Sequence, residues 1–162
     1  MNALTKAIDT RCRGGKFLTL LLGDEEYGIE ILRVQEIIGL LPITVVPRTP
    51  KYIRGVINLR GKVIPVMDLR AKLELEPKEE TYATCIVVVQ SHAGPIGIIV
   101  DRVSEVLQIG DSDIQDPPSF GPTVDIGYIL GMAKSNGRVK LLLNLDRIIA
   151  CEDLQAIPLT EQ

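Results

Sequence analysis

Aromatic residues are scarce in this sequence of 162 residues, which has no Trp, two Phe and four Tyr. A folded core must therefore come from Val, Ile and Leu, and a hydrophobic content of 46% is sufficient for one. Small β-modules that bind nucleic acid need a basic face with aromatic platforms. Because the rings are few and the net charge is −3, the chain is not expected to bind nucleic acid.

Cysteine and histidine are also rare. Cys12, Cys85 and Cys151 are odd in number and widely spaced, which excludes a disulfide framework and favours a reducing compartment. His92 is the single histidine and falls in a predicted turn, where a solvated surface position is expected. The acidic cluster at 111–116 lacks the glycine and the final glutamate of a calcium loop. The sequence thus predicts no enzyme, no metal site and no cofactor.

Long apolar runs are missing as well. The run IIGLLPI at 37–43 is far shorter than the roughly 20 residues needed to cross a bilayer. Residues 1–15 have no continuous apolar core, so they are expected to form a flexible tail and not a secretion signal, and residues 156–162 form a second tail. A cytoplasmic protein without direct membrane insertion is predicted.

An internal duplication organises the chain. The stretch GVINLRGKVIPVMDL at 55–69 recurs as GMAKSNGRVKLLLNL at 131–145, a similarity called the hairpin repeat below. The stretch GIEILRVQEII at 28–38 recurs as GIIVDRVSEVL at 97–107, called the strand repeat. Two similarities in the same order predict two related units, 16–82 and 83–155, which could exchange edge strands.

Short strands dominate the predicted secondary structure. Runs rich in Val, Ile and Leu predict strands at 16–22, 27–31, 43–46, 52–59 and 62–67, and again at 84–90, 96–100, 128–134 and 138–143. A short helix is expected after each hairpin, capped by Asp68 in the first half and by Asn144 or Asp146 in the second. Residues 32–38 fit either a helical turn or a bent strand. Because closure hides strand edges, the predicted fold is all-β, with two small five-stranded antiparallel barrels packed together.

The two hairpins differ at their turns. The second has Asn136-Gly137, the pair best suited to a tight turn with positive φ at both central residues, whereas the first has Arg60-Gly61. If the geometry is kept, a left-handed Arg60 costs roughly 1–2 kcal/mol. The duplication places Glu36 beside this hairpin, so an ion pair could compensate. The alternative is a looser turn with Arg60 at the surface.

Apolar residues that precede the hairpin have two interpretations. Val34, Ile37 and Ile38 are by default core residues. Their repeat-related counterparts at 103–107 belong to the other half of the chain, and such segments can face each other across a joint and leave a partly exposed groove.

Three stretches resemble the CheW family, the adaptors of bacterial chemotaxis. They are LGDEEYGIEILRVQEI at 22–37, TPKYIRGVINLRGKVIPVMDLR at 49–70 and GIIVDRVSEVLQI at 97–109. The resemblance covers about residues 16–150 and implies two five-stranded SH3-like barrels around a shared core. It also implies a scaffold without catalysis or cofactor, which couples the cytoplasmic tips of methyl-accepting chemoreceptors to the regulatory domain of the histidine kinase CheA.

The resemblance implies three sets of site residues. The receptor tip is expected in an apolar groove between the barrels, formed by Ile31, Val34, Ile37, Ile38, Val103 and Leu107. The family's Asn-Leu-Arg-Gly turn corresponds to Asn58, Arg60 and Gly61, with Glu36 as the acidic partner of the arginine. Kinase contacts are expected at Thr44, Val45, Val46, Pro47, Arg54 and Gly55.

Two other functions stay open at this point. One is the equivalent adaptor of a pilus-motility or other alternative chemosensory system, which only the identity of the partners distinguishes. The other, which composition disfavours, is a small-barrel module that binds nucleic acid. The loop at 110–127 departs most from the family and receives no role.

Overall fold

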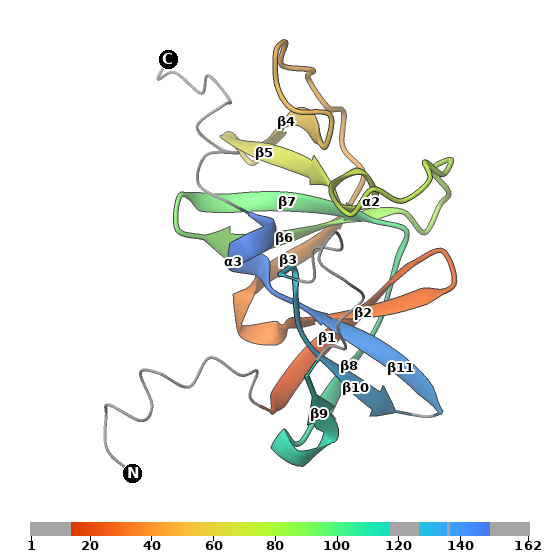
Figure 1. Ribbon diagram of the computed structural model, residues 1–162. Helices are drawn as coiled ribbons and strands as arrows, with labels where there is room; N and C mark the ends of the chain where they lie inside the picture. Colours follow the sequence, from red (N-terminus) through yellow and green to blue (C-terminus); the bar gives the residue numbers. More distant parts are fainter. Residues whose placement is uncertain (1–13, 117–126, 136, 150–162) are drawn as a thin grey trace.

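Two β-sheets make up most of the fold in the computed structural model, which describes residues 14–116, 127–135 and 137–149 (Figure 1). The strands of the first sheet, sheet A, are β1 (Gly15–Leu22), β2 (Glu25–Glu30), β8 (Arg102–Ile109), β9 (Ile114–Gln115), β10 (Ile129–Ser135) and β11 (Arg138–Leu143). The strands of sheet B are β3 (Val34–Gly39), β4 (Ile53–Leu59), β5 (Lys62–Asp68), β6 (Cys85–Ser91) and β7 (Gly94–Val100). The all-β fold class is confirmed.

Each sheet contains strands from both halves of the sequence. The order in sheet A is β8-β1-β2-β11-β10-β9, and the order in sheet B is β3-β6-β7-β5-β4. The first hairpin of each predicted unit, β1–β2 or β6–β7, therefore pairs with strands of the other unit. Figure 1 shows the result: sheet B occupies the upper half of the view and sheet A the lower half. The division into units 16–82 and 83–155 stays a prediction about the duplication, since the sheets do not follow it.

The exchange corrects one detail of the prediction. Barrels of purely antiparallel strands were expected, but β2 pairs with β11 in parallel and β5 pairs with β7 in parallel. In both cases the two strands come from different halves of the chain, so no tight turn forces them to run in opposite directions. Sheet A also has a sixth, two-residue strand, β9, beside β10.

The duplication is reproduced in the strand register. Gly28 lies opposite Leu142 across the β2–β11 pairing, and Gly97 lies opposite Val66 across the β7–β5 pairing. The strand repeat relates the two glycines and the hairpin repeat relates their partners, so these are the same contact in the two sheets. A Cβ atom on Gly28 would lie 2.8 Å from Leu142 Cδ2, and one on Gly97 would lie 2.7 Å from Ile86 Cγ2. A side chain at either position would therefore force a neighbouring side chain to move, and glycine avoids this.

Two one-turn helices follow the hairpins, as expected. The helix α2 (Leu69–Lys72) is capped by Asp68, whose carboxylate accepts hydrogen bonds from the N–H groups of Arg70 and Ala71. The helix α3 (Leu145–Ile148) is capped by Asn144, the first of the two predicted candidates, which accepts from the N–H of Arg147. These caps satisfy N–H groups that the short helices leave without an internal partner.

The two ambiguous segments of the first half are now defined. Residues 31–39 contain both predicted alternatives in succession, a 3₁₀ turn η1 (Ile31–Arg33) and then strand β3. The predicted strand at 43–46 is reduced to one bridge, between Thr44 and Val56. Prolines at 42 and 47 limit how far this segment can pair, because proline has no N–H to donate.

Aliphatic side chains fill the core, as the composition predicts. The largest cluster of buried residues lies between the sheets and takes Leu20 and Ile29 from sheet A and Met67, Val87 and Ile98 from sheet B. Two smaller clusters belong to one sheet each, around Ile64 and Val88 in sheet B and around Phe17 and Leu142 in sheet A. The shared core is what holds the exchanged hairpins together.

Candidate functional site

The turn at Arg60 has the strained geometry that the sequence suggested. Arg60 has φ +52° and Gly61 has φ +85°, so both central residues lie in the left-handed region. The side-chain oxygen of Asn58 accepts a hydrogen bond from the N–H of Gly61 at 2.8 Å. A left-handed arginine costs roughly 1–2 kcal/mol, and one non-local contact of its side chain opposes this strain.

That contact is an ion pair with Glu36. Arg60 Nη2 donates a hydrogen bond to Glu36 Oε2, which ties the β4–β5 turn at one edge of sheet B to strand β3 at the other edge. The glutamate side chain is about one-third exposed and the arginine is two-thirds exposed. Such a pair contributes little to stability, of order 0–1 kcal/mol, so it does not fully offset the strain. At the matching place in the second hairpin, Asn136 lies outside the described residues.

The six predicted groove residues differ in their surroundings. Ile31, Val34 and Val103 are partly buried against the shared core. Ile38 packs on the core of sheet B, and Leu107 packs on the core of sheet A. Ile37 is the most accessible, with 45% of its surface exposed on β3. Three of the six therefore pack on the shared core, and the other three lie at separate positions along β3 and β8.

Exposed apolar side chains recur in repeat-related pairs. Val106 on β8 matches Ile37 in the strand repeat and is 47% exposed. Val63 on β5 and Val139 on β11 match in the hairpin repeat, and both are more than half exposed. The predicted set of groove residues omits Val106, although the strand repeat aligns it with Ile37.

The predicted kinase-binding segment borders the outer strand of sheet B. Thr44 pairs with Val56 through backbone hydrogen bonds of 2.8 and 2.9 Å, so the segment covers part of the β4 edge. Val45 beside it is 76% exposed, whereas Val46 packs on the shared core. The segment thus offers one accessible apolar side chain, and Pro47 follows it at the surface.

Gly55 and Arg54 support this edge in different ways. Gly55 has φ +142°, and a Cβ atom there would lie 2.1 Å from the carbonyl oxygen of Thr44, so no other residue fits. Arg54 Nη2 lies 3.2 Å from Glu80, and Arg54 Nη1 lies 3.6 Å from Asp68. The arginine therefore joins β4 to the segment that links the two halves of the chain.

The remaining candidates for chemistry that the structure describes are Cys85 and His92. Burial raises the pKa of the Cys85 thiol, which disfavours the reactive thiolate. Cys12 and Cys151 lie outside the described residues. His92 is exposed in the β6–β7 turn, with Nε2 3.7 Å from Asp146. Within the described ranges, no three His, Cys, Asp or Glu side chains cluster in a way that could hold a metal ion.

A search of the described helices for a membrane span gives none that is long and apolar enough. The architecture itself defines a class: a duplicated protein of two interlocked β-sheets, with a shared aliphatic core and exposed apolar side chains on both sheets. The sequence matches the CheW-like domain over residues 16–152. The chain belongs to this family, and the resemblance stated from the sequence is confirmed.

Similar proteins span nearly the whole chain. The chemotaxis protein CheW of Klebsiella aerogenes is 35% identical over 144 residues, which cover 89% of this chain and 87% of that protein. Protein FrzA of Myxococcus xanthus is 28% identical and covers 88% of this chain and 89% of its own length. The crystal structure of the scaffolding protein TtCheW from Thermoanaerobacter tengcongensis superposes with a TM-score of 0.78 at 32% identity, covering 86% of this chain and 95% of that one.

Proposed function

We propose that this protein is a cytoplasmic, non-enzymatic adaptor that couples methyl-accepting chemoreceptors to the regulatory domain of the histidine kinase CheA. The observation that carries the proposal is the family match along residues 16–152, together with relatives named as chemotaxis and scaffolding proteins. An adaptor must bind two partners at once. Exposed aliphatic side chains on different elements, Ile37 on β3 and Val45 beside β4, suit that requirement.

The kinase interaction is tested by calorimetric titration of this protein into the isolated regulatory domain of CheA from the same source. Saturable binding near one-to-one is expected. Val45→Asp should abolish or strongly weaken it, because a charge would have to be desolvated in the interface. Val139→Asp is the matched control, since Val139 is also an exposed valine but lies on the other sheet. If the kinase domain does not bind at tens of micromolar, the same titration with the kinase of an alternative chemosensory system decides between the two adaptor functions.

The receptor interaction is tested at Ile37. Ile37→Asp should remove binding of the receptor tip in a co-sedimentation assay and leave the circular dichroism spectrum unchanged, because this side chain is already half in water. Val34→Asp is a poorer test, since Val34 packs on the shared core and a charge there can unfold the protein. Receptor binding of Ile37→Asp at full strength would exclude β3 from the receptor site.

The ion pair at the turn is tested by Arg60→Gly. Glycine relieves the left-handed strain and removes an exposed ion pair, so the stability should change by less than about 1 kcal/mol. Binding of a partner should nevertheless fall if Arg60 and Glu36 present a recognition surface beside Ile37. Unchanged affinity for both receptor and kinase would assign the pair a purely structural role.

A further inference from the structure

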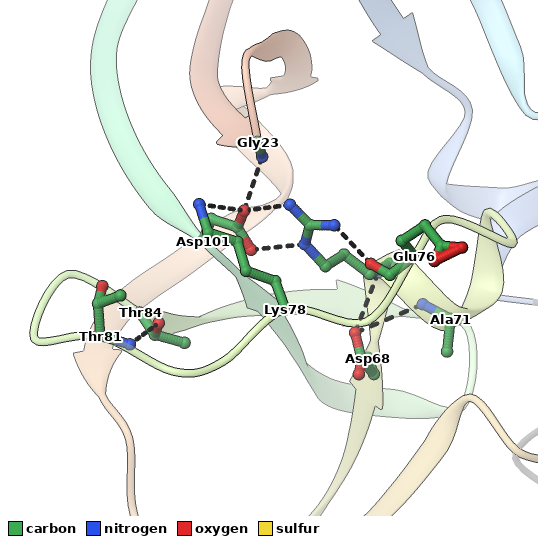
Figure 2. A network of polar contacts seen from close by, with 9 residues as sticks. Gly23, Asp68, Ala71, Glu76, Lys78, Thr81, Thr84 and Asp101 are labelled. Atoms are coloured by element: carbon green, nitrogen blue, oxygen red, sulfur yellow. Dashed lines mark hydrogen bonds and ion pairs between the residues drawn. The ribbon is translucent and has the colours of Figure 1, made fainter.

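The chain crosses from sheet B to sheet A at one residue, Asp101, between the end of β7 and the start of β8. Its carboxylate accepts a hydrogen bond of 2.6 Å from the N–H of Gly23, in the β1–β2 turn of sheet A. It also accepts two hydrogen bonds from Arg70 of helix α2, at 2.9 Å from Nε and 2.6 Å from Nη2. Lys78 Nζ lies 3.7 Å away. Figure 2 shows these groups converging on the one carboxylate.

Arg70 extends the cluster to the segment that links the two halves of the chain. Its Nη1 donates a hydrogen bond of 2.6 Å to the carbonyl oxygen of Glu76. Both members of the central pair are largely buried, with 14% of the Arg70 side chain and 17% of the Asp101 side chain exposed. The two hydrogen bonds between the guanidinium and the carboxylate fix both the distance between Arg70 and Asp101 and their relative orientation.

Polar contacts hold the linking segment at this place. Residues 76–82 are all exposed, and Tyr82 is fully so. The segment borders a cleft of about 440 Å³ that Gly23, Asp101 and Arg138 also line. Farther along, the N–H of Thr81 donates to Thr84 Oγ1 at 2.8 Å (Figure 2). Since burial contributes little here, the segment is held by polar contacts: the Arg54–Glu80 ion pair attaches it to β4 of sheet B, and the Asp101 cluster attaches it to both sheets.

We propose that Asp101 is a positioning residue, whose carboxylate sets the orientation of sheet A relative to sheet B. It contacts the β1–β2 turn of sheet A, helix α2 that follows β5 of sheet B, and Lys78 in the segment between α2 and β6. Strand β8, which begins at the next residue, carries Val103 and Leu107, so its direction determines where these side chains lie relative to β3. The orientation itself does not depend on the proposed adaptor function; its effect on receptor binding does.

The orientation can be measured as a distance between two spin labels. Val63 on sheet B and Val139 on sheet A are suitable sites, because both are exposed and occupy repeat-related positions. Labels are attached to Val63→Cys and Val139→Cys in a background in which Cys12, Cys85 and Cys151 are replaced by Ala. A single narrow distance distribution is expected for the parent protein.

Asp101→Asn should broaden or shift this distribution while circular dichroism shows that both sheets persist. The asparagine side chain has one acceptor oxygen, which cannot accept hydrogen bonds from Gly23 N–H and from both Arg70 nitrogens. Its NH₂ group would also face one of these N–H donors. Asp146→Asn is the control and should leave the distribution unchanged, since Asp146 is a half-exposed member of a different ion pair. An unchanged distribution in Asp101→Asn would overturn the proposal.

A second variant covers the case in which Asp101→Asn does not fold. Arg70→Lys keeps the positive charge but loses the paired hydrogen bonds of the guanidinium, so it should broaden the distribution of label distances in the same way. A distribution identical to that of the parent would overturn the proposal. Receptor co-sedimentation with the same variants is separate: if the parent protein fails to bind receptor, the adaptor function is wrong, but the label distances still decide the role of Asp101.

Discussion

The chain passes from one sheet to the other twice, at η1 between β2 and β3 and at Asp101 between β7 and β8. These two crossings occupy equivalent places in the duplication, and each is held by an ion pair. At the first crossing, Arg33 of η1 donates a hydrogen bond of 2.9 Å to Asp146 of α3. At the second, Asp101 accepts from Arg70 of α2. The hairpin repeat, continued by one position, aligns Arg70 with Asp146. Each crossing is thus tied to the helix that follows a hairpin, but the partner at the crossing comes from neighbouring and not identical repeat positions, since the strand repeat aligns Asp101 with Leu32 and Arg33 with Arg102.

The two pairs also differ in their exposure to water. The Arg33 and Asp146 side chains are 25% and 52% exposed, against 14% and 17% for Arg70 and Asp101. Arg33 also donates to the carbonyl oxygen of Gln90, at 3.1 Å from Nε and 2.9 Å from Nη2. An exposed pair is screened by water and contributes of order 0–1 kcal/mol, whereas loss of one partner of a buried pair costs several times more. The two ion pairs therefore occupy similar positions in the fold, but they are not expected to stabilise it equally.

The largest expected effect is that of Asp101→Asn on stability. The substitution leaves the largely buried Arg70 guanidinium without its carboxylate, so the free energy of unfolding should fall by about 3 kcal/mol. Urea denaturation at pH 7 measures the change, and the slope with urea concentration should stay constant. A loss of less than about 1 kcal/mol would mean that the two crossings are energetically alike.

The pH dependence sharpens the comparison further. Burial alone would raise the pKa of Asp101, but the hydrogen bonds from Arg70 and Gly23 and the positive charges of Arg70 and Lys78 outweigh it, so its pKa is lowered. The pKa of Arg70 is raised in turn, chiefly by its hydrogen bond to Asp101. A carboxyl group with a depressed pKa contributes stability above its unfolded pKa of about 3.9, and this contribution is lost as the pH falls through its folded pKa.

The stability gap between the parent protein and Asp101→Asn should therefore be constant near neutral pH and shrink below about pH 4. Urea denaturation at several pH values measures this gap. Other acidic groups that line the cleft, such as Asp24 and Glu79, are present in both proteins, so the comparison isolates Asp101. A gap that stays constant down to pH 2 would show that the charge of Asp101 is not what stabilises the crossing.

An intermediate effect is expected from exchanging the charges at the second crossing, so that it carries the order found at the first. The double variant Arg70→Asp with Asp101→Arg should recover part of the stability that the single variants lose, with a coupling energy of about 1–2 kcal/mol. Recovery should be incomplete, because the N–H of Gly23 then faces a cation and loses its acceptor. Full recovery would show that only the pair matters and that the hydrogen bond from the β1–β2 turn does not.

Much of the fold could be predicted from local pattern. The hairpin at 55–69, its repeat, the caps at Asp68 and Asn144 and the aliphatic core all follow from short stretches of sequence. The left-handed turn at Arg60 was suggested by its mismatch with Asn136, and Glu36 by the duplication. The exchange of hairpins could not be derived, since β1–β2 fits either sheet equally well in hydrophobic pattern.

The cluster at Asp101 escaped sequence analysis for a related reason. Its members at positions 23, 70, 78 and 101 are far apart in the chain, and their contacts depend on the exchange. Lys140 is a second example. It lies in a predicted apolar strand, at the place of Ile64 in the first hairpin, yet it is buried with Nζ 3.1 Å from Glu26. Only the parallel β2–β11 pairing brings Glu26 beside it.

The smallest expected effect is that of Asp146→Asn at the first crossing. Arg33 keeps its two hydrogen bonds to Gln90, and the lost ion pair is open to solvent, so the free energy of unfolding should fall by at most about 1 kcal/mol. The loss should diminish further in 1 M salt, where the Debye length is about 3 Å, whereas more of the loss in Asp101→Asn should persist because that pair is largely buried. Urea denaturation of both variants at low and high salt measures this contrast. If the two losses of unfolding free energy responded equally to salt, the difference in burial would not explain why the crossings differ. The two ion pairs would then be energetically equivalent.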